Sequence, residues 1–123
     1  MHTREIPQDQ WIPFFNDFSR QHYGEPVTLE LLGQEFGNQP EAQDLPLQGI
    51  TLDTHSPEQF RIEVIAGDTP DAYVTHEIAS PTRVQVAQSE DGVDRALQIE
   101  SADGPVTLVN FGPFEGPSTF GRS

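Results

Sequence analysis

The hydrophobic pattern of this chain changes its period at Gly24, and this change constrains the fold more than any other feature. Before Gly24, large ring side chains recur at steps of three and four residues, the spacing of one helix face: Trp11, Phe14, Phe15, Phe18 and His22. After it, apolar and polar residues alternate from Val27 to Leu31, which is the spacing of one strand face. The sequence therefore predicts an α+β fold, with one N-terminal helix followed by strands.

The predicted helix has clear end signals and one flaw. Pro7 suits a first helical turn, and Gly24 suits a stop just after Tyr23. Pro13 removes a backbone donor and crowds the preceding turn. Either the helix kinks there, or a short turn at 8–11 precedes a helix from about residue 13. We expect the aromatic face to cover the sheet, although the same stripe could bind a partner.

Further strand candidates follow at the spacing of an antiparallel meander. They are residues 39–45, 47–53, 59–66, 72–79, 82–89, 95–101 and 105–111. We expect about six to seven strands that curl into a bent sheet or small barrel, with the helix packed on it. A single α+β domain is predicted for 1–111, and a flexible Gly/Pro-rich C-terminal tail for 112–123.

The charge of the chain is strongly one-sided. It contains no lysine, and its 6 arginines face 20 acidic residues, which leaves a net charge of −14. Self-repulsion on this scale costs stability, and concentrated salt screens it, so we interpret the charge as halophilic adaptation of a bacterium. The rival interpretation is a surface that binds cations or a basic partner. Such a chain repels phosphate backbones, so no nucleic-acid partner is expected.

Several classes of site and location find no support in the sequence. No apolar run approaches the roughly 18 residues of a membrane-spanning helix, and the N-terminus lacks an apolar signal region, so we expect a cytoplasmic protein without a membrane partner. The absence of cysteine excludes disulfides and thiolate chemistry. Neither a nucleophile elbow nor a phosphate-binding glycine loop occurs, and the histidines lack metal-ligand spacing. No catalytic residue, cofactor or metal is therefore predicted.

Two residues are candidates for ligand binding. His76 shares a predicted strand face with Val74 and Ile78, where an imidazole could act as a base or polar anchor, or could be a buried histidine with structural partners. Arg83 opens a strand in a chain with few cations. It could receive an anionic ligand, although an ion pair with Glu63, Glu77 or Glu100 is the simpler interpretation.

Several segments over about residues 4–110 form a recognisable series. They are Arg4-Glu5-Ile6-Pro7 with Trp11, Phe18-Ser19-Arg20-Gln21-His22, Val27-Thr28, Leu45-Pro46-Leu47-Gln48-Gly49-Ile50, Val74-Thr75-His76, Pro81-Thr82-Arg83-Val84, Leu97-Gln98-Ile99-Glu100-Ser101-Ala102-Asp103-Gly104 and Thr107-Leu108. Taken in this order, they resemble an uncharacterised bacterial family of small single-domain proteins, classed as a domain of unknown function. The resemblance implies a short helix followed by strands, and it implies no activity, cofactor or catalytic residue. The chain departs from the pattern at Pro13, where an uninterrupted helix is usual, and at Glu25, where an aromatic residue is usual.

Three hypotheses of function follow. The first is a non-enzymatic protein-interaction or accessory module, which binds an unknown protein partner or self-associates through its sheet edges. The second is a small-ligand-binding protein or minor enzyme that uses a pocket containing both His76 and Arg83. The third is an acidic protein that binds cations through its carboxylates. The question of enzyme activity stays open, with the missing catalytic motifs favouring a negative answer.

Overall fold

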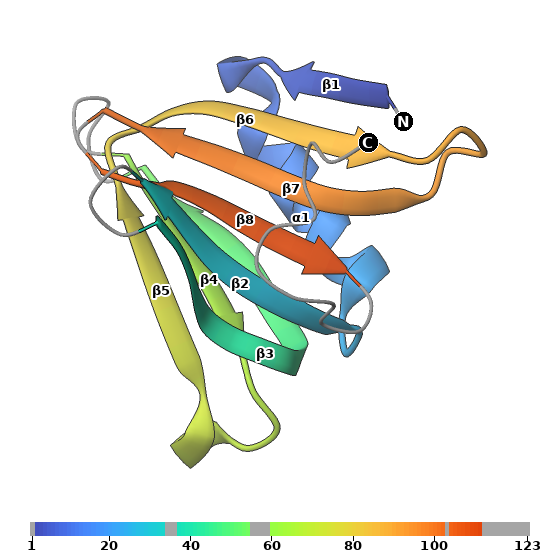
Figure 1. Cartoon of the computed structure of the whole chain (residues 1–123). Coiled ribbons are helices and arrows are strands. Elements are labelled where there is room, and N and C mark those ends of the chain that lie inside the picture. Colours follow the sequence, from blue (N-terminus) through green and yellow to red (C-terminus); the bar gives the residue numbers. More distant parts are fainter. Residues whose placement is uncertain (1, 34–36, 55–59, 103, 112–123) are drawn as a thin grey trace.

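The computed structural model describes residues 2–33, 37–54, 60–102 and 104–111, and within them it contains one α-helix and a large antiparallel sheet (Figure 1). The strands are β1 (His2–Ile6), β2 (Pro26–Gly33), β3 (Gly37–Asp53), β4 (Arg61–Ala66), β5 (Val74–Ala79), β6 (Pro81–Gln88), β7 (Asp94–Ser101) and β8 (Val106–Phe111). The helices are η1 (Gln8–Gln10), α1 (Trp11–His22) and η3 (Pro70–Ala72), of which η1 and η3 are short 3-10 helices. None of these described helices combines the length and apolar character needed to cross a membrane.

The strands form one eight-stranded sheet in the order β1-β6-β7-β8-β2-β3-β4-β5. The prediction of an antiparallel sheet with one N-terminal helix is confirmed, but the expected six to seven strands become eight and the sheet does not close into a barrel. It stays open because, within the described ranges, β1 pairs only with β6 and β5 pairs only with β4. The long strand β3 bends and pairs with β2 through its first part and with β4 through its second (Figure 1).

Two strand predictions needed correction. The candidates 39–45 and 47–53 are one continuous strand, which contains an irregularity at Asp44, where φ is 53° and the register with β2 shifts nearby, and in which Pro46 pairs with Pro26. Strand β1 was not predicted, because only Ile6 of its residues is buried. A strand of this kind exists through its pairing with β6, which local sequence does not encode. The predicted tail 112–123 lies outside the described residues and stays a prediction.

Helix α1 supplies the aromatic part of the core. Trp11, Phe15 and Phe18 are buried, so the aromatic stripe faces the protein's own interior, and the Trp11 Nε1 donates a hydrogen bond of 2.9 Å to the Ile6 carbonyl. The helix is continuous, because it begins at Trp11 and places Pro13 in its first turn, where backbone N–H groups have no intrahelical acceptor. The predicted stop is confirmed, since Gly24 has a φ of 83°.

Candidate functional site

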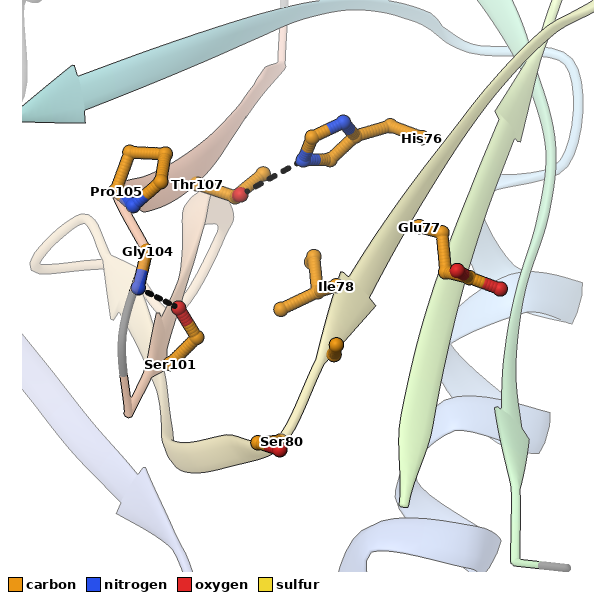
Figure 2. A pocket seen from close by; sticks show the side chains of 9 residues that line it. His76, Glu77, Ile78, Ser80, Ser101, Gly104, Pro105 and Thr107 are labelled. Carbon is orange, nitrogen blue, oxygen red and sulfur yellow. Dashed lines mark hydrogen bonds between the residues drawn. The ribbon is translucent and has the colours of Figure 1, made fainter. Parts of the chain in front are cut away.

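A cleft of about 270 Å³ opens between β5 and the connection from β7 to β8 (Figure 2). One wall is a continuous run along and just beyond β5, from His76 to Ser80. The opposite wall consists of Ser101, Gly104, Pro105 and Thr107. Ser101 closes part of this wall, because its Oγ accepts a hydrogen bond of 3.1 Å from the Gly104 N–H.

The curl of the sheet creates this cleft. His76 is opposite Val64 in the β4–β5 pair, and Thr107 shares its strand face with Val109, so both side chains point to the inner face where the core lies. Three strands separate β5 from β8 in the sheet order, yet His76 Nε2 is only 3.1 Å from Thr107 Oγ1. The curl of the open sheet therefore brings side chains of β5 and β8 into contact here, and Figure 2 shows this pair at one end of the cleft beside Ile78.

The outer edge of β5 runs along the same cleft. Ser80 donates a backbone hydrogen bond of 3.1 Å to the Phe60 carbonyl, so Ser80 belongs to a hydrogen-bonded pair with the β4 side. Backbone groups along a strand alternate in direction with period two. The N–H and C=O groups of Thr75, Glu77 and Ala79 consequently point away from β4, and no described strand lies there to meet them.

The charge near the cleft is sparse. Glu77 is the charged residue that contributes to its lining, but its side chain points away from the cleft (Figure 2), and its Oε1 accepts a hydrogen bond of 3.2 Å from the Arg61 Nη1. Both side chains remain nearly half exposed, at 45% for Glu77 and 49% for Arg61. A pair this accessible to water contributes little to stability, so either group can exchange its partner at low cost.

Comparison with known proteins places the chain in a family. A family model described as a family of unknown function (DUF5335) matches residues 2–118. The chain belongs to this DUF5335 family. The family resemblance inferred from the sequence segments is thereby confirmed.

A curated relative of this DUF5335 chain comes from Aquifex aeolicus (strain VF5) and carries the name "Uncharacterized protein". The two are 27% identical over 113 residues, which cover 92% of this chain and 95% of the relative. No solved structure matches. The comparisons thus supply a family and no activity, so function has to be argued from the residues of the cleft.

The structure separates the two residues that the sequence suggested as ligand anchors. His76 lines the cleft, whereas Arg83 is not among its lining residues. On β6, the Arg83 Nε donates a hydrogen bond of 3.1 Å to Glu5 Oε1, and Glu100 Oε2 lies 3.8 Å from Nη1. Glu100 was one of the predicted ion-pair partners, and Glu5 was not foreseen because β1 was not expected to pair with β6.

Sequence reasoning missed the wall opposite β5. Ser101, Gly104, Pro105 and Thr107 carry no catalytic or binding motif, and only the sheet curl brings them to His76. Among the residues with described positions, no group of three or more histidine or acidic side chains is arranged to hold a metal ion. His55, one of the histidines considered at the sequence level, lies outside that part of the chain.

Proposed function

We propose that this DUF5335 protein is a non-enzymatic interaction module that binds an extended segment of a partner protein along the outer edge of β5. One observation carries the proposal. Three residues of β5 direct backbone donors and acceptors away from β4, and this edge borders a cleft that can receive side chains. An exposed strand edge beside a groove is the arrangement by which sheets recruit an additional strand.

The register of β5 defines how the added strand would lie. Its backbone would pair with Thr75, Glu77 and Ala79, whose side chains face solvent. Because side chains alternate between faces, every second side chain of the added strand would enter the cleft beside His76 and Ile78. Backbone pairing would supply affinity, and the cleft would supply selectivity.

Charge favours a basic partner over a second copy of this chain. Antiparallel pairing of two β5 edges in phase at Glu77 would bring two glutamates opposite one another, and each copy carries a net charge of −14. A partner segment that places lysine or arginine directly across from Glu77, on the same face of the sheet, would instead be attracted. We also propose that the protein works in the cytoplasm of a salt-adapted bacterium. The same acidity supports the salt adaptation, because concentrated salt screens repulsion between the carboxylates.

The test is selection of peptides followed by mapping. Displayed random peptides that bind the protein should contain basic residues, and they should shift the backbone amide signals of Thr75, Glu77 and Ala79 in ¹H–¹⁵N NMR spectra. Two versions of a bound peptide should then be compared, one methylated on its odd-numbered backbone nitrogens and one on its even-numbered nitrogens. One version should lose binding and the other should keep it, because only alternate N–H groups of the peptide face the edge of β5.

A proline scan on β5 supplies the matched control. Thr75→Pro removes an outward N–H without removing a bond to β4, so it should weaken peptide binding at least about tenfold, whereas Thr75→Ala should leave binding close to that of the unmodified protein. Equal binding by both variants, or peptide-induced shifts confined to another face, would exclude this mode of recognition.

A further inference from the structure

A second cleft, which shares no lining residue with the first, lies between α1 and the far ends of β1 and β6. Its volume is about 350 Å³. Its lining residues come from β1, α1, the end of β6, the start of β7 and the turn between these two strands: Arg4, Phe14, Asp17, Phe18, Gln21, Gln88, Gly92 and Asp94. Its lining combines both charges, amides and phenyl rings, so it offers contacts to a ligand that is charged at one end and apolar at the other.

The cleft forms where the inner face of the sheet changes from apolar to polar. Ile6 and Arg4 lie on the same face of β1, and they pair with Val84 and Val86 of β6. Gln88 continues that face beyond Val86. The apolar interior therefore ends in Arg4 and Gln88, and α1 covers the same opening with Phe14 and Gln21.

A fixed carboxylate forms the negative pole of the cleft. Asp94 Oδ1 accepts a hydrogen bond of 2.7 Å from the Gln88 Nε2, and Asp94 Oδ2 lies 2.8 Å from His22 Nε2. The His22 ring is held between Phe18 and Phe111, with both ring centroids 4.5 Å away. Because its neighbours are packed, the Asp94 carboxylate keeps its place without a ligand, as a preorganised binding group does.

The guanidinium of Arg4 forms the positive pole. Across the described ranges, Arg20, Arg61 and Arg83 each contact a carboxylate, whereas no carboxylate oxygen lies within 4.0 Å of the Arg4 guanidinium. Arg95 has no such contact among the described residues either, but of these two arginines only Arg4 lines this cleft. Its planar donors can bind a ligand carboxylate in two places at once.

We propose that this cleft binds a small zwitterion, of the class of free α-amino acids with an apolar side chain. The ligand's carboxylate would meet Arg4, its ammonium group would face Asp94 and Asp17, and its apolar part would lie on Phe14. A zwitterion fits better than an ion of either sign. The net charge of −14 repels anions, and a simple cation would leave Arg4 without a ligand group, whereas a zwitterion offers one charge to each pole.

Three probes that share an isobutyl group test the proposal by ¹H–¹⁵N NMR titration at constant KCl concentration. L-leucine carries both charges, isovalerate carries only the carboxylate, and isoamylamine carries only the ammonium group. Leucine should shift the amide signals of Gln88 and Asp94 with a dissociation constant in the range of about 1–10 mM or below. Isovalerate and isoamylamine should bind at least about tenfold more weakly.

Variants connect any such binding to this cleft. Arg4→Gln removes the charge from an exposed position and should weaken leucine binding at least about tenfold, whereas Arg83→Gln, outside the cleft, should not. No leucine-induced shift up to about 10 mM would overturn the proposal. Equal affinity for isovalerate, or wild-type leucine affinity in Arg4→Gln, would overturn it as well.

Discussion

Asp91 and Asp94 have similar sequence surroundings, since both flank Gly92, yet they have different roles. The turn signals indicate solvent-exposed turn formers for both. The structure agrees for Asp91, which accepts a hydrogen bond from the Ser89 hydroxyl at the surface. Asp94 instead points inward to His22, which is 72 positions away along the chain. The roles of these two aspartates can therefore be distinguished only when the partner of Asp94, which is distant in the chain, is known.

The Ser89 hydroxyl bond gives a prediction at this scale. The pKa of Asp91 is lowered from 3.8, first because Ser89 donates to its carboxylate and then because a backbone N–H does so. Ser89→Ala should move the pKa of Asp91 back toward that value, and ¹³C NMR titration of the carboxyl carbon measures it.

The sign of the effect on stability follows from the direction of the shift. A carboxyl with a lowered pKa in the folded state stabilises the fold above its unfolded pKa, and that stabilisation is lost as the pH falls through the folded pKa. Ser89→Ala and the unmodified protein should therefore differ more near neutral pH than in strong acid. Identical Asp91 titration curves in Ser89→Ala and in the unmodified protein would show that Ser89 does not hold this carboxylate in solution. Ser80→Ala serves as the control and should leave the Asp91 curve unchanged.

At the scale of elements, one serine joins the helix to the sheet. Ser19 Oγ accepts a hydrogen bond of 2.9 Å from the Ile50 N–H and donates one of 3.0 Å to the Ile50 carbonyl. Helix α1 meets β3 at this point, so the orientation of the aromatic stripe depends on a polar contact as well as on apolar packing.

Removal of this contact should destabilise the fold. Ser19→Ala leaves two backbone groups of Ile50 without their side-chain partner, so the free energy of unfolding should fall by about 1–3 kcal/mol. Urea denaturation at fixed KCl concentration measures the change. Asn16→Ala, at an exposed position of the same helix, should change it by less than about 0.5 kcal/mol. An equal loss in both variants would contradict a specific role for the Ser19 contact, because alanine by itself favours the helix.

At the scale of the whole molecule, the charge of −14 is the dominant feature. If it reflects adaptation to salt, the free energy of unfolding should rise steadily from about 0.05 to 3 M KCl, because the screening length shortens over this range. Circular dichroism during denaturation measures this rise. A flat profile would contradict the salt interpretation, and it would favour retention of the acids for a basic partner or for cations.

The sequence by itself determined the local structure of this protein. The three- and four-residue spacing of the aromatic residues, the stop at Gly24 and the alternation within strands arise from contacts between near neighbours, which the order of residues encodes directly. The family was also recognisable from its segments.

Only the tertiary structure decided which strands lie at the edges and which side chains meet in clefts. The pairing of β1 with β6, the contact of His76 with Thr107 and that of His22 with Asp94 each join residues far apart in the chain. Such contacts depend on how the whole sheet curls around α1, and no local pattern reports that curvature. For this reason His76 was found from sequence, whereas the rest of its cleft and the whole of the second cleft were not.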